Sequence, residues 1–482
     1  MTYRVLDLFA GGGGFSTGFQ LARINEKSFE IVRAVELNED ACSTLENHLG
    51  KEKVIQGDVT TEVVKQRIIQ ECNDIDVIIG GPPCQTYSLA GPSRSGKKEM
   101  REALKNDPRN TLFKHFFELV DLIKPKVVVF ENVEGIISKQ LEDNEGEMGL
   151  SAKQTLAIDV ICDELESMGY YLALKANPNY RYQVLNAADF GVAQQRKRVI
   201  IIANRNEILN PSPKRLNRVG EIRKTLREVI GEVPVVLPEI IVNNIKKLLK
   251  IDIIVNDLEK SVMAFVNSIN NIKVKYSDRP EVNSMEFLKI HRYLNNELKG
   301  IVQVTGNKFE WLEQFLRGYN ELLSYYNAVH LNTSLEHTSR KHNFRDIVIF
   351  SLMRSGTSSA QFMNQDSELF DDFLNQVYPY DKTKHVDTYV KHSWDKTSNT
   401  ILSHMEKDGL KFIHPDQPRT FTPYEAALIQ SFPSNYQFSG GRNAKYRQIG
   451  NAVPPLMAKS IGESVIELLN AIDNKNSVAL LR

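Results

Sequence analysis

The chain of 482 residues has few cysteines and no long apolar run, and each absence argues against a class of protein. Its four cysteines, Cys42, Cys72, Cys84 and Cys162, form no C-x-x-C pair, so we expect neither a disulfide framework nor a metal site. No apolar stretch approaches the roughly 18 residues that cross a bilayer, and residues 1–10 are patterned as a strand, not as a secretion signal. We therefore expect a cytoplasmic protein without membrane contacts, in which any functional cysteine is a free thiol.

A net charge is also lacking, because 60 lysines and arginines balance 60 aspartates and glutamates. This balance excludes the uniform positive surface of a nonspecific nucleic-acid coat, although local basic patches remain. Residues 196–224 carry nine basic side chains against two acidic ones, and residues 94–109 carry six against three. Such segments are most often solvated surface, but their closeness to the motifs below favours a functional role.

Within the first two hundred residues, short apolar runs alternate with helical patterns. We expect buried strands at residues 4–9, 31–36, 76–80, 126–130 and 198–203. Between them, apolar residues such as Leu112, Phe116 and Leu119 are spaced as on one face of a helix. The alternation predicts an α/β fold with a doubly wound parallel sheet, whose ligands lie beyond the carboxyl ends of the strands.

The pattern changes after residue 204, where prolines interrupt the chain. One helix is expected through Leu258, Phe265 and Ile272, and another through Trp311 and Phe315. Short β-like pieces are expected at residues 346–350 and 400–403, before strong motifs resume near residue 419. We predict that residues 416–482 complete the first domain, residues 1–206, and that residues 207–415 form an inserted second domain.

A run of four glycines, residues 11–14, directly follows the first expected strand and precedes a helix. Glycines let a ligand approach the backbone and the helix N-terminus. The run does not complete G-x-G-x-x-G, which disfavours a nicotinamide or flavin cofactor. Glu36 ends the next strand, where an acidic residue can accept hydrogen bonds from ribose hydroxyls. Asp58 could follow a third strand and accept a hydrogen bond from an adenine amino group. The three features in this order indicate an adenosyl ligand.

Further motifs follow strand ends and bring a thiol, an acid and two guanidinium groups toward one edge of the sheet. Cys84 stands in Gly-Gly-Pro-Pro-Cys-Gln, where two prolines fix the backbone. A thiol is mostly protonated at neutral pH, so a nucleophilic Cys84 needs positive charge nearby. Glu131 follows another strand, and burial could keep its pKa high enough for it to donate a proton. Arg196 and Arg198, two residues apart, can face the same way and supply the charge.

This ordered set resembles the DNA cytosine-5 methyltransferase family at both ends of the chain. The resemblance covers the glycine turn, Glu36, Asp58, Pro-Pro-Cys-Gln, Glu131-Asn132-Val133 and Gln194-x-Arg196-x-Arg198, then residues 419–427, 430–433 and 446–455. The departures are mild. Ala193 stands where the family usually has proline, and Tyr424 where it often has arginine, and neither replaces a group with a chemical role.

The resemblance implies a Rossmann-like sheet that binds S-adenosylmethionine as methyl donor, without a metal. Cys84 would add to carbon 6 of cytosine, Glu131 would protonate the N3 edge, and Arg196 would contact the base oxygen while Arg198 supports the site. The cofactor-binding residues that it implies are Phe9, Ala10, Gly11, Gly12, Gly13, Gly14, Glu36, Leu37, Asp58, Val59, Pro82, Asn451, Ala452 and Val453.

The implied substrate is double-stranded DNA, from which the cytosine must be flipped out to reach Cys84. Residues 89–110 would form a loop that closes over the base, and residues 207–415 would be a target-recognition domain that reads the major groove. The expected DNA contacts are Gln85, Ser88, Arg94, Lys97, Lys98 and Arg345. The resemblance also implies a monomeric bacterial restriction-modification enzyme, associated with the nucleoid through DNA, that has a separate endonuclease as companion.

Other interpretations stay open. A tRNA cytosine-5 methyltransferase would share this catalytic set, but the large inserted domain favours duplex DNA. A catalytically silent DNA-binding regulatory subunit would keep the fold, although the intact Cys84, Glu131 and Arg196 argue against it. An oxidoreductase is disfavoured by the incomplete dinucleotide motif.

Overall fold

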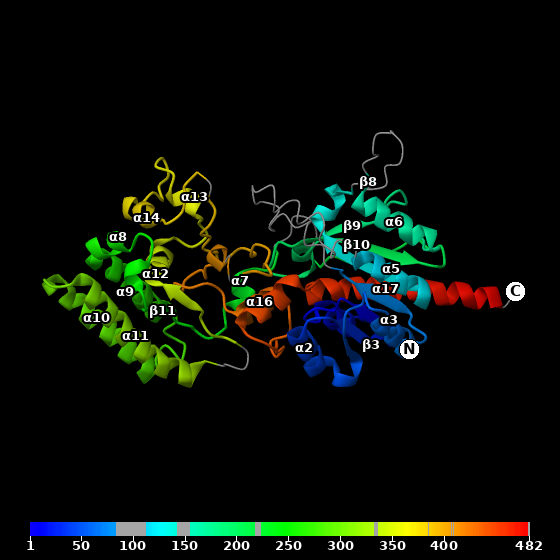
Figure 1. The fold of residues 1–482 in the computed structure, drawn as a ribbon, viewed down its shortest axis with the longest axis horizontal. Coiled ribbons are helices and arrows are strands. Elements are labelled where there is room, and N and C mark those ends of the chain that lie inside the picture. The colour runs from blue at the N-terminus through cyan, green and yellow to red at the C-terminus, as the bar shows by residue number, and fades with distance from the viewer. Residues whose placement is uncertain are drawn as a thin grey trace. The chain divides into compact units, whose positions relative to one another are not determined.

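A computed structural model describes residues 1–82, 112–141, 155–216, 223–331, 336–383, 385–405, 407 and 409–480. The chain forms two compact units (Figure 1). Unit 1 comprises Met1–Arg223, Gln430–Ala444 and Asn451–Arg482, and unit 2 comprises Lys224–Ile429 and Lys445–Gly450. The expected functional division at residues 206 and 415 stays a prediction. Among the described residues, no helix has both the length and the apolar character needed to cross a membrane.

Unit 1 is built on a sheet that, within the described residues, has eight strands in the order β2-β3-β1-β5-β6-β10-β9, with β4 paired to β3. The strands are β1 (Thr2–Leu8), β2 (Arg23–Ile24), β3 (Lys27–Glu36), β4 (Val54–Gln56), β5 (Val77–Gly80), β6 (Val127–Val133), β9 (Gln183–Asn186) and β10 (Lys197–Asn204). The predicted strands at 4–9, 31–36, 76–80, 126–130 and 198–203 are confirmed as β1, β3, β5, β6 and β10. Short apolar runs of this kind are typical of strands buried on both faces.

The sheet is mixed, so the prediction of a wholly parallel sheet was wrong. Strands β4, β3, β1, β5 and β6 are mutually parallel, whereas β10 runs antiparallel to both β6 and β9, and β2 antiparallel to β3. The physical reason is connection length. Few residues join β9 to β10, and a short connection suits an antiparallel pair, while a parallel pair needs a long crossover.

Helices cover both faces of this sheet. Apolar residues of α1 (Gly14–Leu21), α2 (Glu39–Leu49) and α17 (Pro455–Leu480) pack in one core with Val5 and Ile79. Those of α3 (Glu62–Glu71), α5 (Leu112–Ile123) and α6 (Ala157–Ser167) pack in a second core with Leu6 and Ile78. Consecutive strand residues thus point to opposite faces, which gives the three layers of an α/β fold.

Unit 2 is mainly helical around a core of its own. The predicted helices through Phe265 and Phe315 are confirmed as α9 (Leu258–Lys275) and α11 (Lys308–His330), with α10 (Met285–Gly300) packed against both of them (Figure 1). The other elements are α7 (Leu226–Ile230), β11 (Glu239–Ile241), α8 (Ile251–Asn256), β12 (Lys341–Asn343), α12 (Phe344–Leu352), α13 (Ser359–Phe362), α14 (Asp372–Val377) and α15 (Pro423–Ile429).

Both β-like pieces predicted in this unit were wrong. Residues 346–350 lie in the helix α12, which is buried on all sides, and a short apolar run does not separate such a helix from a buried strand. Residues 400–403 belong to no helix or strand in the described structure. Their backbone instead lies against Gly450 in α16 (Arg442–Asn451), where a Cβ would approach the Leu402 carbonyl carbon to 2.4 Å.

Candidate active site

The carboxyl ends of five parallel strands meet at one edge of the unit 1 sheet, because β4, β3, β1, β5 and β6 are neighbours in that order. Asp58 follows β4, Glu36 ends β3, the glycine turn follows β1, and Pro82 follows β5. Glu131 lies near the end of β6, within the strand. The edge therefore collects residues that are far apart in the sequence, as the position of ligand sites in open α/β sheets predicts.

The glycine turn has a backbone that side chains rarely allow. Gly11 and Gly13 have φ values of 55° and 81°, and Phe9 has a φ of 59° just before them. Positive φ is easily adopted only by glycine, so the turn depends on this composition. The Gly13 N–H donates to the Ala10 carbonyl at 3.0 Å, and α1 begins at Gly14.

Two carboxylates flank this turn. Glu36 accepts hydrogen bonds from the N–H groups of Gly11 at 2.8 Å and Asn38 at 2.9 Å, so it ties the end of β3 to the glycine turn. Leu37 beside it is 62% exposed. Asp58 accepts from the Thr60 N–H at 2.9 Å, while Val59 is buried in the core. Backbone N–H groups thus orient the carboxylates of Glu36 and Asp58.

The C-terminal segment of unit 1 packs directly behind the turn. A Cβ on Gly14 would lie 2.3 Å from the Val453 carbonyl oxygen and 2.9 Å from the Ala452 Cβ, so glycine alone fits there. Ala452 and Val453 are both buried, whereas Asn451 is exposed at the end of α16. The structure thus brings two of these three predicted residues against the glycine turn.

An acid and two guanidinium groups gather at β6 and β10. The Arg198 Nε lies 2.8 Å from the Glu131 Oε1, and Arg196 is an electrostatic neighbour of both residues. Arg196 itself is 1% exposed, and its backbone N–H donates to the Asn186 side-chain oxygen at 3.1 Å. That the two arginine side chains face the same way stays a prediction.

Burial controls the protonation of this cluster. It raises the pKa of the Glu131 carboxyl, and the positive charges of Arg198 and Arg196 offset part of that rise. The same loss of solvent lowers the pKa of both guanidinium groups, while Glu131 opposes that change. A carboxyl group with a raised pKa beside a positive charge is suited to donate a proton in a water-poor site.

The backbone that leads to the predicted nucleophile runs beside Glu131. A Cβ on Gly81 would lie 2.6 Å from the Glu131 Oε2, and the Asn132 side-chain amide donates to the Pro82 carbonyl at 3.2 Å. The predicted residues Cys84, Gln85, Ser88, Arg94, Lys97 and Lys98 lie outside the described residues. The described part of the motif therefore ends against Glu131 and Asn132, two residues before Cys84.

Arg345, a predicted DNA contact, is buried in unit 2. Its guanidinium donates to Asp346 at 2.8 Å and to the Leu249 carbonyl at 3.0 Å, and Tyr389 also donates to Asp346 at 2.8 Å. A contact between Arg345 and DNA stays a prediction, and it would require these bonds to open.

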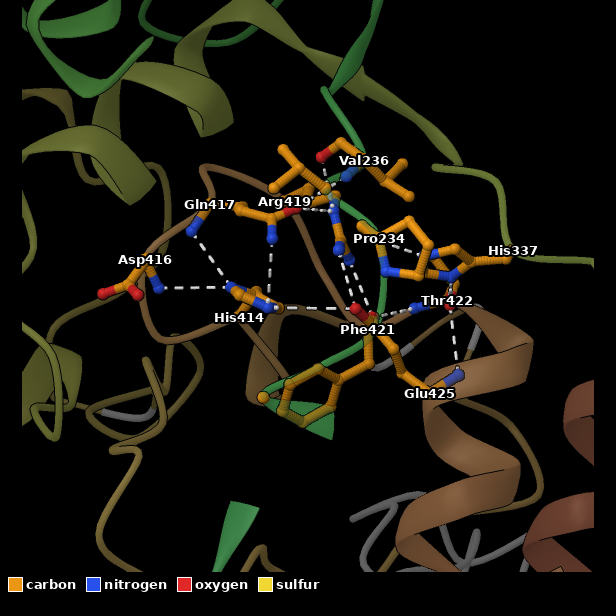
Figure 2. A network of polar contacts seen from close by, with 12 residues as sticks. Pro234, Val236, His337, His414, Asp416, Gln417, Arg419, Phe421, Thr422 and Glu425 are labelled. Atoms are coloured by element: carbon orange, nitrogen blue, oxygen red, sulfur yellow. Dashed lines mark hydrogen bonds and ion pairs between the residues drawn. The ribbon is translucent and has the colours of Figure 1, made fainter. Parts of the chain in front are cut away.

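The family-like segment at residues 419–427 forms a buried polar network within unit 2, which Figure 2 shows. Two nitrogens of the Arg419 guanidinium donate to the two oxygens of Glu425 at 2.7 and 2.8 Å. The Nε of Arg419 donates to the Val236 carbonyl at 2.9 Å, and the Thr422 hydroxyl contacts a ring nitrogen of His337 at 3.1 Å. The network joins chain segments that are nearly two hundred residues apart, so it has a structural role in unit 2.

Sequence reasoning gave no role to three buried polar residues, although two of them, Gln194 and Gln430, lie in the segments that carry the family resemblance. Asp7 in β1 is buried, burial raises its pKa to about 7, and it accepts a hydrogen bond from Ser16. Asp7 is a charged residue within the otherwise apolar run of β1, and this could have marked it in the sequence as a buried polar group. Gln194 and Gln430 are buried and bonded to each other, and Gln430 donates to the Ala452 carbonyl at 2.8 Å. Nothing in their spacing predicts that contact.

Comparison with known proteins gives one consistent family. The family model described as C-5 cytosine-specific DNA methylase matches residues 3–467. The type II methyltransferase M.DdeI of Desulfomicrobium norvegicum is 28% identical, over 98% of this chain and 91% of its own. The type II methyltransferase M.Bpa9945I of Bacillus paralicheniformis is 26% identical, over 97% of this chain and 99% of its own.

The fold is similar to that of a crystal structure whose protein is assigned as a DNA modification methyltransferase encoded within a prophage (E. coli). The two share 19% sequence identity and a TM-score of 0.54, and the match covers 97% of this chain and 99% of the other. The predicted Rossmann-like α/β fold is thereby confirmed.

Proposed function

The chain belongs to the C-5 cytosine-specific DNA methylase family, and from this premise we propose that it transfers a methyl group from S-adenosylmethionine to carbon 5 of cytosine in double-stranded DNA. The observation that carries the proposal is the cluster of Glu131, Arg198 and Arg196 beside the backbone that leads to Cys84. It provides an acid and positive charge where the base must react.

The residues along the sheet edge fit the proposed cofactor. At Gly11, where a Cβ would meet no atom within 4 Å, the glycine turn would allow close approach of the cofactor, and Glu36, held by two N–H groups, would accept the ribose hydroxyls. The exposed Leu37 offers an apolar surface to the adenine ring, and Asp58 an acceptor for its amino group. When bound, S-adenosylmethionine supplies an electrophilic methyl group. We propose that Phe9, Ala10, Val59, Pro82, Asn451, Ala452 and Val453 complete this site.

The proposed chemistry begins with Cys84, whose thiolate forms a bond to carbon 6 of the base. The electron pair displaced from the C5–C6 double bond makes carbon 5 nucleophilic, and Glu131 delivers a proton to N3 so that no negative charge accumulates on the ring. Arg196 contacts the base oxygen, and Arg198 holds Glu131 in position. Once the methyl group is on carbon 5 and S-adenosylhomocysteine has been left behind, a water molecule takes the proton from carbon 5, and that electron pair re-forms the C5–C6 double bond. The C6–S bond breaks at the same time to return the thiolate, and N3 gives its proton back to Glu131.

A cytosine within a duplex is inaccessible to Cys84, so the base is flipped out at a cost of about a few kcal/mol. We propose that Gln85, Ser88, Arg94, Lys97 and Lys98 contact the DNA and that residues 207–415 include the recognition domain. Arg94, Lys97 and Lys98 would contact phosphates, which fix position and make binding salt-dependent.

The wider role is inferred from relatives that are named as type II methyltransferases. We propose that the chain acts in the bacterial cytoplasm as a monomer, on nucleoid DNA, and protects its target sites from a companion endonuclease.

The proposal is tested by expressing the chain in a host whose DNA lacks 5-methylcytosine and then mapping that base across the genome. We expect 5-methylcytosine at one short recurrent sequence, and none with Cys84→Ala, which should still bind S-adenosylhomocysteine. Cys162→Ala is the matched control, because Cys162 is a buried thiol in the core formed with α6 and is not among the proposed site residues, so its replacement should leave methylation intact. Methylation of tRNA and not of duplex DNA, or methylation that survives Cys84→Ala, would contradict the proposal.

A further inference from the structure

A buried tyrosine from the C-terminal part of unit 1 contacts the glycine turn. The Tyr436 hydroxyl donates to the Gly12 carbonyl at 2.8 Å. Tyr436 belongs to the segment Gln430–Ala444, more than four hundred residues after the turn. No motif assigned above gives this side chain a role in the reaction.

The hydrogen bond fixes one peptide group at both of its ends. The Gly12 carbonyl and the Gly13 N–H belong to the same peptide unit. The carbonyl accepts from Tyr436, and the N–H donates to the Ala10 carbonyl at 3.0 Å. A peptide between two glycines can otherwise rotate at little steric cost, because neither residue has a Cβ.

The peptide group before Gly11 is held in the same way. Its carbonyl is the Ala10 oxygen that accepts from Gly13, and its N–H is the Gly11 group that donates to Glu36 at 2.8 Å. The Gly11–Gly12 peptide lies between these two hydrogen-bonded units. Tyr436 thus completes the restraint of the turn that the proposed cofactor approaches.

The tyrosine ring is itself immobilised. The His48 ring stacks on it at 3.6 Å between centroids and 9° between planes, and the rings of Phe432 and Phe438 lie within 5.1 Å. The hydroxyl lies so close to Gly13 that a Cβ there would be 2.5 Å from it. Burial raises the pKa of Tyr436, a hydrogen bond with the Thr17 side chain offsets part of that rise, and the nearby Asp7 adds to it. The net shift is upward, so the hydroxyl stays protonated and remains a donor.

We propose that Tyr436 is a positioning residue for the methyl donor, whose hydroxyl locks the Gly12–Gly13 peptide and so holds the glycine turn ready for the cofactor. The inference rests on the proposed function, because it takes the glycine turn as the binding site for S-adenosylmethionine. A turn fixed before binding spends less of the binding free energy on ordering its backbone.

The test is Tyr436→Phe, which removes one oxygen atom and keeps the packed ring. Calorimetric titration with S-adenosylhomocysteine should show affinity reduced about fivefold, the size expected for one hydrogen bond between neutral groups. The KM for S-adenosylmethionine should rise by a similar factor, while kcat and the KM for DNA stay unchanged. A general loss of structure would instead change kcat and the KM for DNA together with the KM for S-adenosylmethionine.

Tyr170→Phe is the matched control. The Tyr170 hydroxyl is also buried and donates to a backbone carbonyl, that of Pro125 at 2.9 Å, but it lies in the opposite core of unit 1. It should leave the affinity for S-adenosylhomocysteine unchanged, and thermal unfolding should show that both variants fold. If Tyr436→Phe binds S-adenosylhomocysteine as tightly as the parent chain, or if Tyr170→Phe loses as much affinity as Tyr436→Phe, the inference about Tyr436 is overturned and the proposed function stands. A parent chain that binds no S-adenosylhomocysteine would overturn the proposed function, and the inference with it.

Discussion

The Arg198 Nε lies 2.8 Å from the Glu131 Oε1, across the antiparallel pair formed by β10 and β6. In the register of these strands Arg198 is opposite Val133 and Glu131 is opposite Ile200, so the two side chains are diagonal neighbours on one face. Both are nearly enclosed by protein. The contact therefore depends on the pairing of two strands whose interacting residues are more than sixty positions apart in the sequence.

Removing Arg198 should move the pH dependence of the reaction. The positive charge of Arg198 lowers the pKa of Glu131 against the effect of burial, so Arg198→Met should raise that pKa further. If protonated Glu131 is required, activity falls as pH rises through its pKa, and the alkaline limb of kcat/KM for DNA should shift to higher pH. A pH–rate profile measures this.

Lys197→Met is the control for that profile. Lys197 is the preceding residue, but it is 57% exposed and its partner is Glu134. Its removal should leave both limbs in place. An unshifted alkaline limb in Arg198→Met would show that Glu131 does not titrate in the reaction.

Glu36→Gln should weaken cofactor binding selectively. The carboxylate accepts from two N–H groups, and a neutral amide can replace those contacts and the proposed ribose contacts only in part. We expect the KM for S-adenosylmethionine to rise about tenfold, in line with the loss of a hydrogen bond to a charged group. The KM for DNA should not change. Glu39→Gln, in the exposed first turn of α2, should behave as the parent chain, and an equal effect there would refute the ribose assignment.

A double-mutant cycle should reveal the role of the network in unit 2. Burial alone would raise the pKa of the Glu425 carboxyl. The Arg419 guanidinium outweighs that effect and holds the pKa well below its usual range. Arg419→Met leaves a buried carboxylate without its partner and should cost about 3–5 kcal/mol in urea unfolding. Arg419→Met combined with Glu425→Leu should cost less than Arg419→Met alone. A double variant as unstable as the sum of the single variants would show that the two residues do not interact.

The predicted basic loop should control the salt dependence of DNA binding. If Lys97 and Lys98 contact phosphates, replacing both with Gln should reduce the slope of log K against log salt by about two. Lys51 and Lys53, which lie just before β4 at the end of that strand opposite the proposed site, provide a double replacement of equal charge as a comparison. A slope that is unchanged in the Lys97 and Lys98 variant would show that these residues do not reach the DNA.

Much of unit 1 was predictable from sequence, because strands buried on both faces appear as short apolar runs and their ligands follow at one edge. That Asp58, Glu36, the glycine turn and Pro82 follow strand ends was predicted by such reasoning, whereas their order along the edge comes from the strand pairing. The direction of β10 does not, since it depends on how the chain returns to the sheet. The helix α12 was mistaken for a strand because all-round burial removes the helical period from its sequence.

The contacts that restrain the site could not be read from spacing. Tyr436 reaches Gly12, and Gln430 reaches Ala452, through packing between segments with no periodic relationship. Only Asp7 left a signal, as a charged residue within an apolar strand. Tertiary contacts of this kind become visible when the sheet and its covering helices are placed together.

The most direct test of the account is covalent trapping. The chain is incubated with S-adenosylmethionine and a duplex that carries 5-fluorocytosine at the mapped target position, where the fluorine blocks removal of the group on carbon 5. The account predicts a denaturation-stable complex whose cross-linked peptide, identified by mass spectrometry, contains Cys84, and no complex with Cys84→Ala. A complex attached through another residue, or methylation of the target by a chain that forms no complex, would contradict it.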